Sequence, residues 1–395
     1  MHPNLTALHK IAQKPERIIL GLMSGTSMDG LDLALCRITG TDVDTTCHLL
    51  QFETVPYNAD VKNKIREVFP RETVSIQSLT LFHKWFGLLH GKMINETLSK
   101  WGISSHEVDL IASHGQTVYH APLSLHNLSE VGNATLQLGD ADHIAVATGI
   151  ITLSDFRQKQ IAGGGEGAPL AIYGDALLFG KSNEPIVLLN IGGISNFTFL
   201  PGKNEEGSYM VTDCGPGNTL MDMFVQKYFP PLQFDENADL AQKGTIRTDW
   251  LDAMLQHPFF SLPIPKSTGQ ELFNLEWIEK LAGPISRDSD KLDMLATLNY
   301  LSALSIAKVI KTLPSYTLIE HVYVSGGGVH NPKLMKNISA ALPEISFHSM
   351  EMLGMNPDAK EAVLFAVLAN QTIAKGGFPL KGLPSLSLGK ISFPL

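Results

Sequence analysis

Two glycine-rich turns, each placed between an apolar segment and an alternating one, constrain the fold of this chain more than any other feature. The first turn, residues 25–30 (GTSMDG), follows the apolar run 18–20. The chain leaves it with Leu31, Leu33 and Leu35 on every second position, and this period of two predicts a β-strand. Residues 186–200 (IVLLNIGGISNFTFL) repeat the layout. Two such hairpins predict two lobes of duplicated architecture.

Helical periodicity separates these hairpins from further strands. Apolar residues recur near every 3.6 positions in 82–101 and 291–313, which predicts two long amphipathic helices. A strand is expected at 321–324 and another helix at 358–374. Strands that alternate with helices are typical of an α/β protein.

Length and composition indicate a globular protein of two lobes. The chain has 395 residues, of which 44% are hydrophobic and 17% charged, so each lobe can bury a core. We expect a first lobe over 1–150, with an N-terminal extension at 1–16, and a second lobe over 151–354. Residues 355–395 are expected to pack back on the first lobe.

Charge and cysteine content indicate which partners and which cellular compartment to expect. The net charge is −9 and no Lys/Arg run occurs, which argues against a nucleic-acid partner. Three unpaired cysteines fit a reducing compartment, and no apolar stretch is long enough to span a membrane. We therefore expect a cytoplasmic protein without a membrane partner.

The turn at residues 25–30 has the composition of an anion cradle. Backbone N–H groups and hydroxyls can converge at such a tip and bind phosphate. It is neither a Walker loop nor a Rossmann fingerprint, because it leads into a strand and lacks the lysine. Asp29 and Asp32 could hold a hydrated Mg²⁺ beside a phosphate. The alternative is an ordinary hairpin turn.

Two further glycine segments extend the same prediction. The second hairpin tip carries Gly192 and Gly193, and a nucleotide triphosphate could be held between two such cradles. Gly326, Gly327 and Gly328 follow a predicted strand and precede a helix, where glycine permits close approach of a ring or a phosphate. Tight packing of strand on helix would explain the same three glycines.

Asp213 is the candidate catalytic carboxylate. It opens a rigid turn, DCGPGN, between a short apolar run and a predicted helix. Phosphoryl transfer needs a carboxylate within hydrogen-bond reach of the attacking oxygen. The alternative is that Asp213 only satisfies backbone N–H groups of its turn.

Three other polar residues have both a ligand-binding and a structural explanation. His114 ends a strand and is either a ligand contact or a satisfied structural histidine. Arg157 could bind a carboxylate or phosphate through two hydrogen bonds, or pair with a neighbouring acid. Glu361 lies on a predicted helix, where a charged side chain is usually just solvated.

The ordered set of motifs resembles that of the anhydro-N-acetylmuramic acid kinases. The segments, running from about residue 21 to about residue 361, are GLMSGTSMDGLDLAL, SHGQT, DFR with AGGGEGAPL, LNIGGISN, DCGPGNTLMD, PKSTG and SGGGVHN. Each motif alone is modest, and the series in this order is specific.

The resemblance implies a fold, a reaction and a set of residues. It implies a duplicated actin-like ATPase fold (ribonuclease H-like) with an active-site cleft between the lobes. It also implies a cytoplasmic homodimer that uses ATP and Mg²⁺. The reaction would hydrolyse the 1,6-anhydro ring of 1,6-anhydro-N-acetylmuramic acid and phosphorylate O6 during cell-wall recycling.

The implied roles fall on specific positions of this chain. Asp213 would be the catalytic base, and the sugar would be bound by His114, Gln116, Arg157 and Glu361. The nucleotide site would comprise Gly25, Thr26, Ser27, Met28, Asp29, Gly30, Leu31, Asp32, Gly192, Gly193, Gly326, Gly327 and Gly328.

Two other functions remain open from the sequence. A kinase of the same fold could act on a different anhydrosugar, such as levoglucosan. A nucleotide-gated ATPase regulator without a sugar substrate would hydrolyse ATP slowly, whatever sugar is added.

Overall fold

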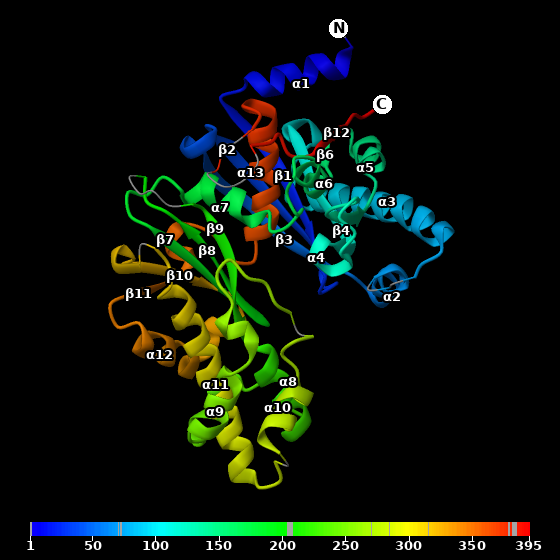
Figure 1. The fold of residues 1–395 in the computed structure, drawn as a ribbon. Helices are drawn as coiled ribbons and strands as arrows, with labels where there is room; N and C mark the ends of the chain where they lie inside the picture. Colours follow the sequence, from blue (N-terminus) through cyan, green and yellow to red (C-terminus); the bar gives the residue numbers. More distant parts are fainter. Residues whose placement is uncertain are drawn as a thin grey trace. The chain divides into compact units, whose positions relative to one another are not determined.

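The chain divides into two compact units, each with its own sheet. The computed structural model describes residues 2–69, 71, 73–203, 208–269, 271–283, 285–314, 316–377, 380 and 385–395. The first unit comprises residues 1–181 and 358–395, and the second comprises 182–357 (Figure 1).

The first unit is built on a mixed seven-stranded sheet in the described part of the chain. Its central order is β3-β2-β1-β4-β6, with β12 at one edge and β5 paired to β4. The first three strands are antiparallel, whereas β4 and β6 run parallel to β1. The strands are β1 (Glu16–Ser24), β2 (Gly30–Thr39), β3 (Thr46–Pro56), β4 (Leu110–Ala121), β5 (Ala134–Leu138), β6 (Thr152–Ser154) and β12 (Lys390–Ser392).

The second unit has a five-stranded sheet of order β9-β8-β7-β10-β11 in its described residues. Again the first three strands are antiparallel, and β10 and β11 run parallel to β7. The strands are β7 (Ile186–Ile191), β8 (Ile194–Leu200), β9 (Met210–Pro216), β10 (His321–Ser325) and β11 (Ser346–Ser349).

Both sheets therefore follow one plan, a strand order of 3-2-1-4-5 with an antiparallel meander followed by parallel strands. Both predicted hairpins are confirmed, since β1 pairs with β2 and β7 with β8 in antiparallel register. The duplicated α/β architecture predicted from the two glycine turns is confirmed.

Helices cover both sheets and account for the long periodic segments. The predicted long helices are α3 and α11, and the helix expected at 358–374 is α13. The helices of the first unit are α1 (Pro3–Gln13), α2 (Ala59–Val68), α3 (Ile76–Trp101), α4 (Leu123–His126), α5 (Ala141–Thr148), α6 (Phe156–Ala162), α7 (Ala171–Phe179) and α13 (Lys360–Ala374). Those of the second are α8 (Thr219–Tyr228), α9 (Thr248–Leu255), α10 (Leu275–Ala282), α11 (Asp288–Ile310) and α12 (Pro332–Ala341).

The C-terminal helix α13 packs on the sheet of the first unit, beside β1 (Figure 1). Gly21 makes this approach possible, because a Cβ there would lie 1.9 Å from the carbonyl oxygen of Ala362. Since α13 carries Glu361, this contact fixes the position of Glu361 relative to β1.

The boundary between the units differs from the one expected at residue 150. Residues 151–181 belong to the first unit, because β6 pairs with both β4 and β12 and because α7 packs against α13. The C-terminal segment that returns to this unit begins at Asp358.

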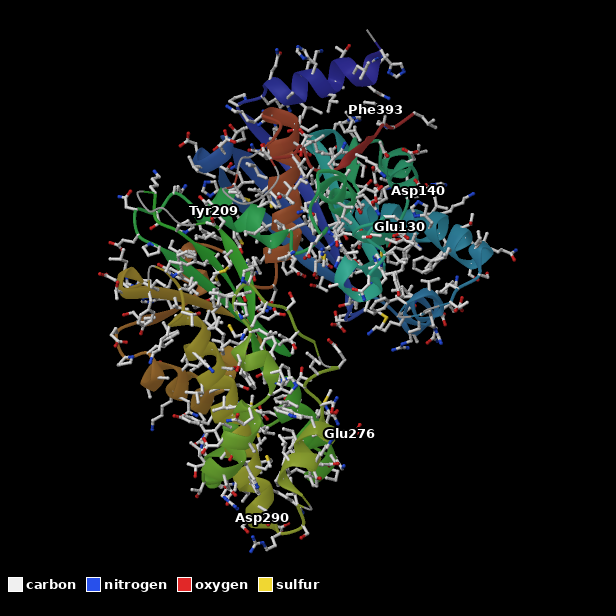
Figure 2. The ribbon with its side chains drawn as sticks, viewed as in Figure 1. Glu130, Asp140, Tyr209, Glu276, Asp290 and Phe393 are labelled. Carbon is white, nitrogen blue, oxygen red and sulfur yellow. The ribbon has the colours of Figure 1, made fainter. Side chains whose placement is uncertain are left out.

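Polar contacts secure the outer helices of the first unit. The buried guanidinium of Arg17 donates to the carbonyl oxygens of Ile11 and Ala12, which ties α1 to the sheet. Asp140, labelled in Figure 2, caps α5 by accepting from the backbone N–H groups of Asp142 and His143. No helix in the described residues is long and apolar enough to cross a membrane.

Candidate active site

The turn after β1 is held in a defined shape by backbone hydrogen bonds. The N–H of Met28 donates to the carbonyl of Gly25 at 3.2 Å, and Met28 has a left-handed φ of 59°. The N–H of Tyr57 donates to the carbonyl of Asp29 at 2.9 Å. Thr26, Ser27 and Asp29 are exposed at the tip, so the turn presents its polar groups to solvent.

Gly25 and Gly30, which stand at the two ends of this turn, differ in whether packing requires glycine at their position. At Gly30 a Cβ would lie 2.5 Å from the carbonyl oxygen of Val55, so the fold itself requires glycine there. At Gly25 the nearest atom to a Cβ would be Oγ of Ser27 at 3.6 Å, which is ordinary contact distance. Packing therefore does not require glycine at position 25.

Two of the expected nucleotide contacts in this segment, Leu31 and Gly30, are buried in the structure. Leu31 is completely buried in the apolar core of the first unit, so its side chain has no access to a ligand. The reason is the register of β2, in which Leu31, Leu33 and Leu35 all point into one core. Gly30 is also buried, and Val55 occupies the space beside it.

Asp32 lies on the other face of β2, among several carboxylates. Burial raises the pKa of Asp32, the hydroxyl of Thr54 opposes this by donating to Oδ1 at 2.6 Å, and the charges of Asp358 and Asp29 add to the rise. Such a concentration of negative charge favours a bound cation.

The carboxylates near the turn do not form a closed set of direct metal ligands. Among the described residues, the one group of three His, Cys or carboxylate side chains with converging ligand atoms is Glu184, Glu320 and His321, beside the starts of β7 and β10 in the second unit. Asp29 and Asp32 therefore fit a cation that keeps most of its water shell, as Mg²⁺ usually does beside phosphates.

The first unit brings His114 and Arg157 into direct contact. Nε of Arg157 donates to Nε2 of His114 at 2.8 Å, and Nη1 donates to the carbonyl of Gly167 at 2.9 Å. Burial, together with the charge of Arg157, lowers the pKa of His114 to about 3. The ring is therefore neutral, and its proton is on Nδ1 because Nε2 accepts.

Glu361 completes this group at the start of α13. Its side chain is exposed, although neighbouring residues lie close enough to reduce the hydration of the carboxylate. This partial desolvation raises the pKa of Glu361, the charge of Arg157 lowers it, and Asp32 raises it again. Conversely, burial lowers the pKa of Arg157 and Glu361 opposes the change. The two charges thus stabilise each other.

Gln116 has a different place from the one expected. Its side chain is 0% exposed, Oε1 accepts from Oγ of Ser24 at 2.7 Å, and Nε2 donates to the carbonyls of Gly25 and Thr117. A buried amide with both ends satisfied has no group left for a sugar. In this structure Gln116 supports the glycine turn, and its role as a sugar contact stays a prediction.

In the second unit the three glycine segments meet backbone to backbone. The N–H groups of Gly217 and Asn218 donate to the carbonyls of Gly193 and Gly192, each at 2.8 Å. Gly326 lies against the carbonyl oxygen of Ile191, where a Cβ would come within 2.6 Å. Three glycine segments that are distant in sequence therefore pack against one another through their backbones.

Packing requires glycine at some of these positions and not at others. A Cβ at Gly326 or Gly328 would overlap Ile191, so packing requires both glycines. At Gly192 the nearest atom would be 3.5 Å away, and at Gly327 the nearest would be Nδ2 of Asn218 at 3.6 Å. Packing within the fold therefore does not require glycine at Gly192 or Gly327.

Asp213 is held by residues 266–268, a segment more than 50 positions away in the chain. The N–H of Asp213 donates to the carbonyl of Lys266 at 2.9 Å, and the N–H of Thr268 donates to Oδ2 of Asp213 at 2.7 Å. Burial raises the pKa of Asp213, and the hydrogen bond from Thr268 opposes this. A half-buried carboxylate with a raised pKa is suited to accept a proton.

Lys266 anchors this segment in the core. It is 9% exposed, and its Nζ donates to the carbonyl of Phe259 at 2.9 Å and lies 4.3 Å from the centre of that ring. The neighbouring thiol of Cys214 is fully buried, and burial strongly raises its pKa, which argues against a role as nucleophile.

Two units of one strand order, each with a glycine turn at its first hairpin, define a duplicated ATPase fold of the actin type. The sequence model of the family "Anhydro-N-acetylmuramic acid kinase" matches residues 17–383. The chain belongs to this family.

Full-length relatives agree with this placement. A protein of Pseudoalteromonas atlantica, named anhydro-N-acetylmuramic acid kinase, is 49% identical over 400 residues and covers 100% of both chains. The protein of the same name from Pseudoalteromonas translucida is 47% identical over 401 residues, again with 100% of both chains covered. That from Caldanaerobacter subterraneus is 38% identical over 369 residues, or 93% of each chain.

Proposed function

We propose that this chain is an ATP-dependent kinase for 1,6-anhydro-N-acetylmuramic acid. It would hydrolyse the 1,6-anhydro ring and phosphorylate O6, giving N-acetylmuramic acid 6-phosphate and ADP. The observation that carries the proposal is similarity over the whole chain to proteins of this name, one of which is 49% identical. The arrangement of Asp213 and of the glycine turns supports it.

Asp213 is the base in this proposal. It would take a proton from the water that attacks the anomeric carbon, while the bond from that carbon to O6 breaks. O6 would then attack the γ-phosphate of ATP. Its raised pKa makes Asp213 a stronger base than an ordinary aspartate, and the Thr268 N–H keeps the carboxylate oriented.

Three glycines mark the proposed nucleotide contacts. Backbone N–H groups at Gly25, Gly192 and Gly327 would approach the nucleotide, because packing within the fold does not require glycine at these positions. Asp29 and Asp32 would hold hydrated Mg²⁺, which supplies charge neutralisation for the transferred phosphoryl group when bound.

Arg157, His114 and Glu361 are the proposed sugar contacts. The substrate carries a lactyl carboxylate and hydroxyls, which suit a guanidinium donor and a carboxylate acceptor respectively. His114 would act mainly by orienting Arg157, since its Nε2 is already engaged.

The cellular setting belongs to the same proposal. We infer a cytoplasmic homodimer that acts in peptidoglycan recycling, as the family resemblance implies. Sedimentation in solution should give about twice the chain mass of 43.0 kDa. A mass of one chain at micromolar concentration would exclude the dimer.

One experiment tests the reaction. Purified protein, Mg-ATP and 1,6-anhydro-N-acetylmuramic acid in ¹⁸O-labelled water should give a phosphorylated product with one ¹⁸O at the anomeric position. Phosphorylation of levoglucosan in preference to the amino sugar would contradict the substrate assignment. ATP hydrolysis without any sugar dependence would instead support a regulatory ATPase.

A further inference from the structure

A line of buried polar side chains crosses the apolar core of the first unit and ends at the glycine turn. His90 on α3 is 0% exposed, Tyr57 after β3 is 4% exposed, and Ser24 and Gln116 are 1% and 0% exposed. Their neighbours form one hydrophobic cluster that includes Phe82, Phe86 and Ile94. Polar groups at such depth destabilise a core unless they are hydrogen-bonded, so their presence requires an explanation.

Each residue in this line donates a hydrogen bond to the next, from His90 toward the glycine turn. The hydroxyl of Tyr57 donates to Oγ of Ser24 at 2.9 Å, and Ser24 donates to Oε1 of Gln116 at 2.7 Å. Because the only hydroxyl proton of Tyr57 is used, Nε2 of His90, at 2.9 Å, must donate to the Tyr57 oxygen. Gln116 then donates to the carbonyl of Gly25 at 3.3 Å.

No member of the line changes charge near neutral pH. Burial lowers the pKa of His90 to about 3 and raises that of the Tyr57 hydroxyl above its usual value. The order of donors is therefore constant over the working range of a cytoplasmic enzyme, and the bonds reinforce one another.

Tyr57 holds the turn at two points. Its hydroxyl reaches Ser24, the last residue of β1, and its backbone N–H donates to the carbonyl of Asp29 near the start of β2. Between these points the backbone adopts the left-handed conformation at Met28. A turn with exposed Thr26, Ser27 and Asp29 has little packing of its own to keep this shape.

We propose that Tyr57, supported by His90, is a positioning residue that fixes the turn at residues 25–30 in the shape that receives phosphate. The inference rests on the proposed nucleotide role of this turn. Amides that stabilise a charged phosphoryl group are effective only when they are oriented before the ligand arrives. The buried line supplies that orientation from the rigid helix α3.

The test variant is Tyr57→Phe, which keeps the ring against Phe86 and removes the hydroxyl. Hydrogen exchange of a peptide spanning residues 23–31, measured without ligand, should accelerate about fivefold to tenfold. The KM for ATP should rise by a similar factor, with kcat and the KM for the sugar within about twofold of wild type. His90→Phe should act in the same direction and by less.

A matched control separates positioning from general loss of stability. Thr148→Val also removes a buried hydroxyl of the first unit, but this hydroxyl bonds only to the backbone of Ile144 and Ile150. It should leave exchange of the turn and the KM for ATP unchanged. The double variant Tyr57→Phe with Ser24→Ala should lose no more than the larger single effect, because both act through one line.

The outcomes distinguish this inference from the proposed function. Unchanged exchange of the turn in both Tyr57→Phe and His90→Phe would overturn the positioning role, whatever happens to ATP. Faster exchange with an unchanged KM for ATP would support the hold on the turn and refute the assignment of the turn to the nucleotide.

Discussion

The backbone N–H of Thr268 donates to Oδ2 of Asp213 at 2.7 Å, and the N–H of Asp213 in turn donates to the carbonyl of Lys266. The two segments thus exchange hydrogen bonds in both directions. This pairing fixes the side chain of Asp213 without a partner of positive charge. It leaves a carboxylate that is oriented and basic, which is the combination that general base catalysis requires.

Asp213→Asn should abolish most of the activity and little of the stability. Asparagine still accepts the Thr268 N–H but does not take a proton, so kcat should fall by about 10²–10⁴. Ring opening and phosphorylation should fall together, because one activated water drives both. Asp293→Asn is the control, since Asp293 also accepts a backbone N–H in this unit, from Thr245 at 2.7 Å. Ring opening that persists without phosphorylation would show that another group activates the water.

The activity should decline on the acid side above the usual range of an aspartate. Burial raises the pKa of Asp213, and the base must be ionised, so kcat/KM should fall as the pH drops through that raised value. The midpoint is expected above about 3.9, the ordinary value for aspartate. A profile that stays flat down to about pH 4 would contradict either the raised pKa or the role of the base.

The same raised pKa predicts how stability depends on pH. The folded protein binds the proton of Asp213 more tightly than the unfolded chain, so ionisation of Asp213 destabilises the fold. This cost is complete above the raised pKa and vanishes below the ordinary value near about 4. Asp213→Asn should therefore melt at or above wild type at neutral pH, and the gap should close as the pH falls. A mutant that melts well below wild type at every pH would assign Asp213 to the structure.

The two glycines of the first turn should respond differently to alanine. Gly25→Ala should fold normally, because a Cβ there meets only ordinary contacts, yet it should lose the increase in melting temperature caused by Mg-ATP. Gly30→Ala should lower the melting temperature in the absence of any ligand, because its Cβ would lie 2.5 Å from a carbonyl oxygen. Thermal melts with and without Mg-ATP check both. An unchanged nucleotide shift in Gly25→Ala would remove this turn from the ATP site.

Local patterns predicted the hairpins and long helices, because a period of 2 or 3.6 is a property of neighbouring residues. Contacts between residues far apart in the chain were harder to predict from the sequence. The first unit extends to residue 181 because β6 pairs with the C-terminal strand β12, more than 200 residues later, and no local signal encodes that contact. The partnership of Asp213 with Thr268 is likewise distant in sequence.

Side-chain direction explains why two of the expected site residues are buried in the structure. Gln116 lies in a motif that resembles a substrate-binding segment, but its position on β4 turns it inward toward Ser24. Leu31 is next to exposed turn residues, yet the alternation along β2 buries it. A sequence motif indicates which segments are functional. The register of the strand determines whether a given side chain points toward a ligand or into the core.

Arg157→Lys tests the proposed sugar contacts. Arg157 uses Nε for His114 and Nη1 for the carbonyl of Gly167, two directions that a single ammonium group does not reproduce. The KM for the anhydro sugar should therefore rise about tenfold or more, with the KM for ATP unchanged. Arg247→Lys is the matched control, because Arg247 makes a two-point contact with exposed Asp249 and belongs to neither proposed site. Equal and small effects of both substitutions on the sugar KM would show that Arg157 only braces the loop at Gly167.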